Sequence, residues 1–484
     1  MKHLPFIGRK ESLAKLKGLF KKKTASLVVI RGRRRIGKSR LVEEFAKGTT
    51  FYFFTGLAPI PKMTPNLQRE EFARQLQEQL GIPGLKGEDW GDLFTILAKY
   101  TSKGKMVILL DEISWMGSLD PTFLGKLKIT WDIYLSKNPE LILVLCGSVS
   151  SWIEKNIISS TGFFGRISQK IFLNELSLPS CNRMLEEIGF KGSIMEKLIL
   201  LSITGGVPWY LELLNPSLSA PENIKQLCFE KDGVLFDEFK QIFHDLFGKR
   251  SDIYQNIVKL LVNGPADYQT ISKELNYPSG GPLSEYLTEL ILSGYIERDY
   301  TWSIKTGKES KLLQYRLADN YLRFYLKYIE PNHNKIEKGH FIIKSLTTLT
   351  NWDAILGFQF ENLVLHNRKI VQKSLKIDPS DIVYDNPFFQ RKTTKQLGCQ
   401  IDYLIQTRYN TLYICEIKFS RKEISPAIVN EVKEKIKRLK YPKGFSCIPV
   451  LIHINGYSKL IEENEFFMET IDFGDFLSLD YRDD

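Results

Sequence analysis

Apolar and polar positions alternate in a regular way along the first 215 residues. Short apolar runs rich in Val, Ile, Leu and Phe predict buried strands at residues 26–31, 51–55, 106–110, 141–146 and 167–173. The segments between these runs have helical spacing. Strands that alternate with helices are typical of a parallel sheet covered by helices, so the pattern predicts an α/β fold for this region.

The pattern changes in the rest of the chain. Mostly helical spacing covers 175–245, and amphipathic helices are then predicted at 253–262, 268–275 and 282–293. A hairpin follows, with strands that begin near residues 294 and 312. Three helices closed by a hairpin describe a winged helix. The last region is predicted to contain helices at 353–367 and 423–440 and strands near 382–384, 399–405, 411–419 and 447–452.

The residues after the first predicted strand have the spacing of a phosphate-binding loop. The pattern G-x-x-x-x-G-K-S/T is formed by Gly32, Arg33, Arg34, Arg35, Ile36, Gly37, Lys38 and Ser39, and Arg40 follows at the start of the next helix. Between a strand and a helix, such a loop presents backbone N–H groups and the positive end of the helix dipole to phosphate oxygens. Lys38 is expected to contact the β- and γ-phosphates, and Ser39 is expected to hold Mg²⁺. The pattern predicts a nucleoside triphosphate site.

Three further segments carry side chains suited to phosphate chemistry. Asp111 and Glu112 end the apolar run 106–110, where Asp111 is expected to support Mg²⁺ and Glu112 to polarise the attacking water. Ser148 follows the run 141–146 and is a candidate to lie beside the γ-phosphate, and a helix cap is the alternative. Arg166 follows a glycine and is a candidate to contact the γ-phosphate, in cis or from a neighbouring subunit. The alternative for Arg166 is an ordinary surface arginine.

Composition and charge restrict the class of protein further. The formal net charge is +11 with a pI near 9.0, which favours an acidic partner such as nucleic acid, and a solvated basic surface is the alternative. The six cysteines show no C-x-x-C spacing, which argues for a reducing compartment and against a disulfide framework or a zinc site. Neither an apolar leader nor a stretch of about 18 apolar residues is present, so we expect a cytoplasmic protein without a membrane partner.

Several motifs occur together in a way that resembles one known group. They are the loop Gly32–Ser39, the opening Phe6-Ile-Gly-Arg9, the strand Leu-Leu-Asp-Glu, the segment Phe164-Gly-Arg166 and the turn Gly205-Gly-Val-Pro208. The combination is similar to archaeal-type ATPases of the AAA/STAND branch of P-loop proteins. The resemblance implies that Phe6, Arg9 and Pro208 flank the nucleotide base. It also implies that a winged helix and a restriction-endonuclease-like domain follow the ATPase.

The expected fold class is therefore α/β, with a P-loop NTPase parallel sheet, a helical lid, a winged helix and a C-terminal α/β restriction-endonuclease-like domain. The corresponding boundaries are residues 1–175 for the P-loop ATPase core, 176–248 for the lid, 249–330 for the winged helix and 331–484 for the last domain. In such an arrangement the winged helix is either a reader of DNA or a spacer between modules.

The last domain contains a second group of chemically suited residues. Glu361 lies on a predicted apolar helix, Asp402 lies inside a predicted strand, and Glu416 and Lys418 lie on the next strand, where alternation places both on one face. The set is similar to the PD-(D/E)xK nuclease core, in which acidic residues bind Mg²⁺ and the lysine orients water. Ile401 replaces the proline of that motif, and a salt-bridged structural strand is the alternative. A second Mg²⁺ or Mn²⁺ is the cofactor expected here.

The sequence thus predicts Mg²⁺-dependent ATP binding and hydrolysis, coupled to a nuclease-like domain that acts on DNA or another nucleic acid. The alternative is a slow-turnover nucleotide switch, or a nucleic-acid-binding signalling scaffold with an inactive nuclease fold. The expected partners are ATP or ADP, a nucleic acid and further copies of the same chain.

Overall fold

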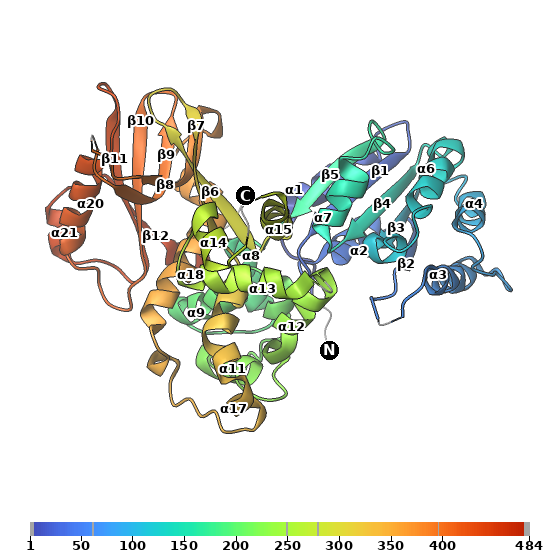
Figure 1. Cartoon of the computed structure of the whole chain (residues 1–484), viewed down its shortest axis with the longest axis horizontal. Helices are drawn as coiled ribbons and strands as arrows, with labels where there is room; N and C mark the ends of the chain where they lie inside the picture. Colours follow the sequence, from blue (N-terminus) through green and yellow to red (C-terminus); the bar gives the residue numbers. More distant parts are fainter. Residues whose placement is uncertain (1–3, 61, 248–249, 278–279, 395, 479–484) are drawn as a thin grey trace. The chain divides into compact units, whose positions relative to one another are not determined.

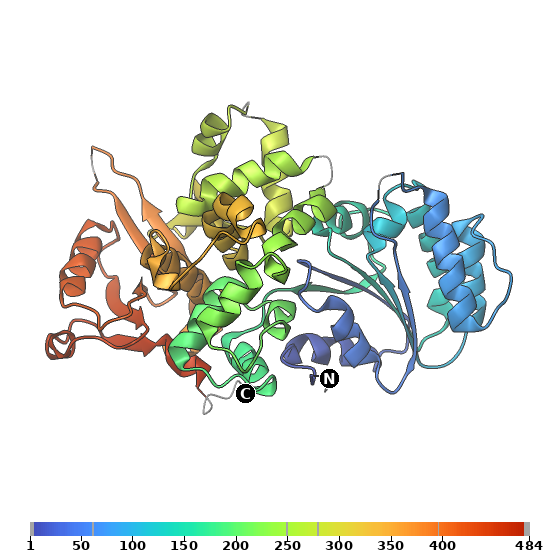
Figure 2. The same cartoon turned by 90° about the horizontal axis from the view of Figure 1, so that it is seen from below.

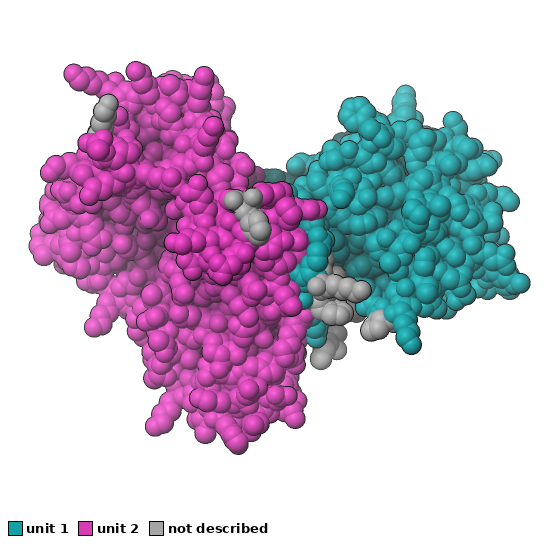
Figure 3. Space-filling model, in the orientation of Figure 1, with its two compact units in different colours: residues 1–174, 241–251, 288–294 teal, residues 175–240, 252–287, 295–484 magenta. Residues whose placement is uncertain are grey.

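The computed structural model describes residues 4–60, 62–247, 250–277, 280–394 and 396–478. These residues form two compact units (Figure 3). Unit 1 consists of residues 1–174, 241–251 and 288–294, and unit 2 consists of residues 175–240, 252–287 and 295–484. The division into four domains remains a prediction.

A five-stranded parallel sheet forms the centre of unit 1 (Figure 1). Its strand order is β2-β3-β4-β1-β5, so β4 lies between the strand that leads into the phosphate-binding loop and the strand that ends in two carboxylates. All five predicted strands are present, as β1 (Ser26–Gly32), β2 (Thr50–Thr55), β3 (Met106–Asp111), β4 (Leu141–Gly147) and β5 (Ile167–Leu173).

Helices cover both faces of this sheet (Figure 2). Val28 and Ile30 pack on the face covered by α1 (Lys10–Leu19) and α2 (Lys38–Ala46), whereas Leu27 and Val29 pack on the opposite face. The opposite face is covered chiefly by α3 (Pro65–Leu80), α4 (Trp90–Tyr100) and α6 (Phe123–Ile133), with the shorter helices α5 (Ile113–Gly117) and α7 (Ser150–Ile153) at the carboxyl ends of β3 and β4. Burial on both faces explains why β1, β3 and β4 are continuous apolar runs.

Helices precede the second sheet along the chain. They are α8 (Leu178–Glu187), α9 (Ile194–Thr204), α10 (Pro208–Glu212), α11 (Ala220–Cys228), α12 (Val234–Phe247), α13 (Ser251–Leu260), α14 (Tyr268–Glu274) and α15 (Gly281–Leu292). The antiparallel hairpin of β6 (Ile296–Ser303) and β7 (Lys308–Leu317) comes next. Three helices and a hairpin therefore follow in the predicted order, and their assignment as a winged helix stays a prediction.

The hairpin is fixed to the C-terminal sheet within unit 2. The ring of Trp302 stacks on Tyr384 with 4.9 Å between centroids and meets Phe388 edge-on at 5.2 Å. Its Nε1–H donates a hydrogen bond of 2.5 Å to the side chain of Gln406. Trp302 and Phe388 belong to one core, so the hairpin and the C-terminal sheet share their packing.

The C-terminal sheet has the order β12-β11-β10-β9-β8 (Figure 1). The strands β8, β9 and β10 are antiparallel neighbours, while β10, β11 and β12 run parallel. Their bounds are β8 (Ile382–Gln390), β9 (Cys399–Thr407), β10 (Thr411–Lys418), β11 (Ser446–His453) and β12 (Glu469–Asp472). The associated helices are α16 (Asn320–Phe324), α17 (His333–Glu337), α18 (Trp352–His366), α19 (Arg368–Ser374), α20 (Ala427–Arg438) and α21 (Lys459–Glu463).

A separate mixed α/β region at the C-terminal end is therefore present. Among the described residues, none of the helices combines the length and the apolar character that crossing a membrane would require.

Candidate functional site

The turn from β1 into α2 depends on backbone conformations that favour glycine. Gly32, Arg35 and Gly37 have positive φ values of 155°, 68° and 85°. A Cβ atom on Gly32 would lie 2.5 Å from the carbonyl oxygen of Leu173, so only glycine allows the loop to pass this close to the end of β5. The loop thereby opens onto the N-terminal end of α2, where backbone N–H groups have no partner within the helix.

Lys38 is a buried cation at the centre of this loop. Its side chain is 6% exposed, and its Nζ donates hydrogen bonds to the carbonyl oxygens of Gly32 at 3.2 Å and Arg33 at 3.1 Å. The ammonium is therefore held over the loop by the loop's own carbonyl groups. This places a positive charge where the loop would enclose phosphate oxygens.

Ser39 and Asp111 are brought together although they lie on different elements. The Ser39 hydroxyl on α2 donates a hydrogen bond of 2.5 Å to Oδ2 of Asp111 at the end of β3. The other carboxylate oxygen of Asp111 accepts the backbone N–H of Glu112 at 3.0 Å, which fixes the orientation of the carboxylate. A hydroxyl and a carboxylate beside a phosphate-binding loop are the groups that hold Mg²⁺ in P-loop proteins.

Glu112 and Ser148 form a second contact across the strand ends. Glu112 follows β3 with a φ of 47°, and its Oε2 accepts the backbone N–H of Ser148 at 3.0 Å and the Ser148 hydroxyl at 2.8 Å. Burial raises the pKa of Glu112; the charge of Lys38 opposes this shift and that of Asp111 adds to it. Ser148 is thus engaged by the carboxylate predicted to polarise water.

Arg166 is held by an acidic residue of α6. Its Nε and Nη2 donate to the two carboxylate oxygens of Asp132 at 2.7 and 2.9 Å, and this hydrogen bonding lowers the pKa of Asp132 to about 2. Lys128 lies 2.9 Å from the same carboxylate. A contact between Arg166 and a γ-phosphate would require the guanidinium to leave Asp132.

The remaining predicted nucleotide-binding residues lie around the loop or on other elements. Arg9 donates to the carbonyl oxygens of Ile36 at 3.1 Å and Asn174 at 2.6 Å, so it ties the loop to the segment after β5. Arg40 donates to the carbonyl oxygens of the N-terminal residues Leu4 and Pro5. Arg33 is buried, whereas Arg34 and Arg35 are half-buried. Phe6 packs against the core next to α1 and α2. Pro208 is the first residue of α10 and belongs to unit 2. Their contact with a nucleotide base remains a prediction.

In the C-terminal sheet, an irregularity of β9 positions Asp402. Asn386 pairs with Leu404 and Phe388 pairs with Ile401, so two residues of β9 lie opposite the single residue Pro387. Such a bulge changes the direction of side chains, and proline is tolerated there because it has no N–H to donate. One carboxylate oxygen of Asp402 accepts the backbone N–H of Ile417 on the neighbouring strand at 2.9 Å.

Glu416 lies beside Asp402 and contacts two lysines. It is fully buried, and its two carboxylate oxygens lie 3.1 Å from Nζ of Lys418 and 2.5 Å from Nζ of Lys435. The same Lys435 ammonium lies 3.5 Å from Asp402. Glu416 and Lys418 therefore share one face of β10, as predicted, and Lys435 from α20 is a member of the group that the sequence analysis missed.

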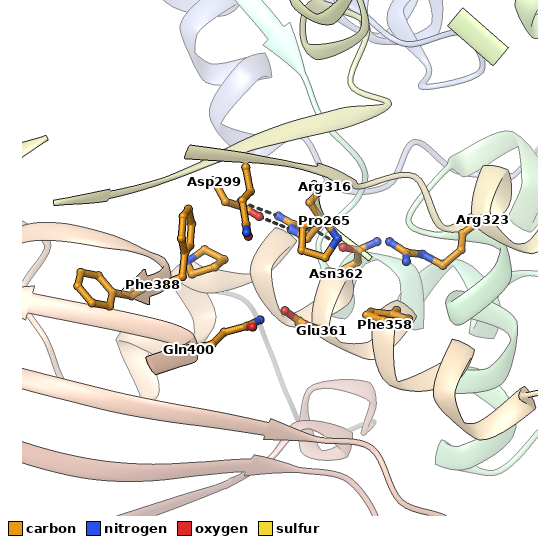
Figure 4. A pocket seen from close by; sticks show the side chains of 12 residues that line it. Pro265, Asp299, Arg316, Arg323, Phe358, Glu361, Asn362, Phe388 and Gln400 are labelled. Carbon is orange, nitrogen blue, oxygen red and sulfur yellow. Dashed lines mark hydrogen bonds and ion pairs between the residues drawn. The ribbon is translucent and has the colours of Figure 1, made fainter. Parts of the chain in front are cut away.

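Glu361 approaches the same group from α18. Its side chain lines a small hollow and points toward Gln400 (Figure 4). The ion pair of Asp299 and Arg316 lines the same hollow. Burial, followed by the negative charge of Asp402, raises the pKa of Glu361 to about 7. Burial and the charge of Glu416 raise the pKa of Asp402 to about 6, and Lys435 opposes that shift.

The predicted C-terminal residues are thus neighbours, but their arrangement differs from a ready metal site. Within the described part of the chain, no three His, Cys, Asp or Glu side chains are placed to hold one metal ion. The ammonium of Lys435 lies between the carboxylates of Asp402 and Glu416 instead. A sequence signal for this lysine existed: it follows the inward positions Ile428 and Val432 at helical spacing, so it falls on the apolar side of α20.

The comparisons with known proteins give a family match in the N-terminal part and similarities that cover about two thirds or more of the chain. Residues 6–214 match the family model of an ATPase domain predominantly from Archaea. The uncharacterized protein MJECL04 of Methanocaldococcus jannaschii is 26% identical over 366 residues, which are 74% of this chain and 76% of that protein.

Two solved structures are similar to part of the fold. One is a Walker-type ATPase of Pyrococcus abyssi, with a TM-score of 0.47 and 16% identity over 66% of this chain and 96% of that one. The other is the ORC2 protein of Aeropyrum pernix, with a TM-score of 0.41 and 15% identity over 70% of this chain and 96% of that one. Together with the loop geometry, the family match indicates that residues 6–214 contain a P-loop domain similar to archaeal ATPase domains.

Proposed function

We propose that the chain binds ATP together with Mg²⁺ at the phosphate-binding loop and hydrolyses it. The contact of 2.5 Å between Ser39 and Asp111 carries this proposal, because it joins the two groups that would hold the ion directly or through water. Both lie next to the buried ammonium of Lys38 at the start of α2. A cation and a hydroxyl–carboxylate pair suited to Mg²⁺ therefore lie at the N-terminal end of α2.

The catalytic role falls on Glu112. Its carboxylate follows directly on Asp111 and is the group placed to polarise a water molecule for attack on the γ-phosphate. Ser148 holds that carboxylate through two hydrogen bonds, so Ser148 is a positioning residue for it. The γ-phosphoryl charge would be met by Lys38 and by the bound Mg²⁺.

Phosphate release from ATP by the purified full chain tests this proposal. We expect release with Mg²⁺ and none when EDTA removes the metal. Failure of the chain to bind ATP in the presence of Mg²⁺ would contradict the proposal.

A slow-turnover nucleotide switch is a second candidate for the same site. It is favoured by the state of Glu112, whose carboxylate is buried, has a raised pKa and is hydrogen-bonded to Ser148. A carboxylate held in this way must be released before it can polarise water. Nucleotide that stays bound through gel filtration, together with a steady-state rate far below the single-turnover rate, would identify the switch.

We expect the substitution Arg166→Ala to lower the rate of ATP turnover more than the affinity for ATP. If the arginine reaches the γ-phosphate during the reaction, its charge can contribute on the order of 10³ in rate. Lys128→Ala is a matched control, because Lys128 lies on the same carboxylate of Asp132 as Arg166 does. The measurements are kcat and Kd for ATP over a range of protein concentrations.

If Arg166 acts across a subunit interface, activity per chain should rise with protein concentration in the wild type and should not rise in Arg166→Ala. A variant with weaker ATP affinity and an unchanged rate at saturation would rule out this role.

For the C-terminal domain we propose metal-dependent cleavage of nucleic acid. Asp402 and Glu416 share the ammonium of Lys435, and Lys418 contacts Glu416, which supports the proposal because these residue types, with Glu361 nearby, fit a Mg²⁺ or Mn²⁺ site with a water-orienting lysine. The metal would take the position that the Lys435 ammonium has between the two strand carboxylates. A nuclease assay on DNA and RNA with Mg²⁺ or Mn²⁺, with and without ATP, tests the activity.

Competition between Lys435 and a metal gives a second test. We expect Lys435→Met to bind Mn²⁺ more tightly than the wild type in nucleotide-free protein, because the substitution removes one of the two ammonium partners of the buried Glu416 carboxylate. Without metal the variant should be less stable, since breaking one half of a buried ion pair costs about 3–5 kcal/mol. Lys437→Met, at an exposed position of the same helix, is the control.

The stability of the metal-free protein should depend on pH. The pKa values of Asp402 and Glu361 are raised in the folded state, to about 6 and about 7, so the folded state binds more protons than the unfolded state between the ordinary carboxyl range and those values. Stability should therefore fall as the pH rises from about 4 to about 7, and Mn²⁺ should reverse the fall. Equal Mn²⁺ affinity of Lys435→Met and Lys437→Met would show that Lys435 does not occupy a metal position.

A further inference from the structure

A dense group of exposed cations lies where the end of α20 meets the connection from β8 to β9. It comprises Arg391, Lys392, Lys437, Arg438, Lys440 and Lys443, and we name this group the basic rim. The two segments are fixed to each other through Gln390. Its side-chain N–H groups donate to the carbonyl oxygen of Arg438 at 2.9 Å, and its side-chain oxygen accepts the backbone N–H of Lys440 at 3.0 Å.

The basic rim carries more positive charge than its neighbours neutralise. Glu434 lies 3.6 Å from Lys437 and 3.7 Å from Arg438, and Asp267 pairs with Arg391 at 2.7 Å. The other three cations, Lys392, Lys440 and Lys443, have no acidic partner among the described residues. A surface with several uncompensated like charges attracts a polyanion and raises its rate of association.

A groove begins at the basic rim. It has a volume of about 340 Å³, in the range of small-ligand pockets, and its lining includes Gln390, Arg391 and Gln400. Gln314, Phe389 and Gln400 also line the smaller hollow of Figure 4, in which Glu361 and Gln400 point toward each other. The groove therefore leads from Arg391 of the basic rim, which lines it together with Asp267, toward the hollow that Glu361 lines.

We propose that the basic rim and this groove bind a nucleic-acid strand, with phosphates on the basic rim and bases in the groove. The side-chain amides of Gln314 and Gln400 can hydrogen-bond to base edges, and the ring of Phe389 can stack on a base. Anionic lipid and acidic protein surfaces would match the charge of the basic rim but offer no flat bases for these groups. The choice of nucleic acid rests on the function proposed for the C-terminal domain, and the strand would pass that domain's carboxylates.

The test measures binding without cleavage. The full chain with Asp402→Asn is titrated in EDTA against fluorescently labelled single-stranded and duplex DNA and single-stranded RNA. The rim variant combines Lys392→Gln, Lys440→Gln and Lys443→Gln, none of which removes an ion pair among the described residues. The control combines Lys21→Gln, Lys22→Gln and Lys23→Gln, which changes the net charge equally at exposed positions of unit 1.

We expect the rim variant to bind at least one of these nucleic acids about tenfold more weakly than the control does, with a salt dependence of log K shallower by about 2–3. Equal affinities and equal salt slopes in the two variants would overturn the proposal. The proposal would also be overturned if the rim variant lost binding to anionic lipid vesicles but still bound nucleic acid as the control does. If nucleic-acid binding depended on the basic rim but the wild-type chain cleaved no nucleic acid with Mn²⁺, only the nuclease function would be contradicted.

Discussion

The variant Lys38→Ala should release no phosphate from ATP above background. Lys38 supplies the buried cation of the phosphate-binding loop, held by the carbonyl oxygens of Gly32 and Arg33. Hydrogen bonds to charged groups are worth about 1.5–3 kcal/mol each, so the loss of this ammonium should weaken ATP binding by about tenfold or more. The effect on turnover is larger, because negative charge moves on the γ-phosphoryl group during transfer and the Lys38 ammonium is the group expected to contact it.

The measurement is phosphate release at saturating ATP together with the Kd for ATP. Lys47→Ala is the matched control, since Lys47 is an exposed lysine just after the other end of α2. Thermal unfolding of both variants shows whether the protein remains folded when the loop carbonyl groups lose their hydrogen bonds to the ammonium. A rate of Lys38→Ala equal to that of the control would mean that the loop has no role in turnover.

The second large effect is expected for Glu112→Gln. The amide cannot accept a proton from water, so hydrolysis should slow by about 10²–10⁴, the usual contribution of a general base. ATP and Mg²⁺ should still bind, because Lys38, Ser39 and Asp111 are unchanged. The glutamine oxygen can also accept the two hydrogen bonds from Ser148, so the local structure should persist.

The pH dependence gives an independent check on Glu112. Its pKa is raised by burial in the nucleotide-free protein, so kcat/KM should fall on the acidic side at a pH above the ordinary glutamate range. This acidic limb should be absent from Glu112→Gln. Glu140→Gln, at an exposed residue just before β4, should keep both the rate and the limb. Normal hydrolysis by Glu112→Gln would assign the water-polarising role to another residue.

Much of the architecture could be predicted because it is encoded locally. The strands β1, β3 and β4 are continuous apolar runs, since they are buried on both faces, and such runs are recognisable without knowing their neighbours. The strand β12 was missed for the opposite reason. It has four residues, Glu469–Asp472, of which only Ile471 is buried, so it carries almost no apolar signal.

The partners of individual side chains were harder to predict. Asp132 is 34 residues from Arg166 along the chain, and nothing near either residue indicates their ion pair. Lys435 was likewise absent from the predicted C-terminal group. Its role depends on the way α20 lies over β9 and β10, which brings its ammonium to Glu416 and Asp402.

The phosphate-binding loop, the acidic pair at Asp111 and Glu112 and the alternation that places Glu416 with Lys418 are all encoded in short stretches of sequence. These features follow from residue types at fixed local spacing, because the geometry of a strand or of a strand–loop–helix unit sets the direction of its side chains. The contact of Ser148 with Glu112, the ion pair of Asp132 with Arg166 and the position of Lys435 between two carboxylates instead arise from the packing of the folded chain. The partners of charged groups depend on how close and how buried the groups are in the packed structure, and neither can be read from their separation along the sequence.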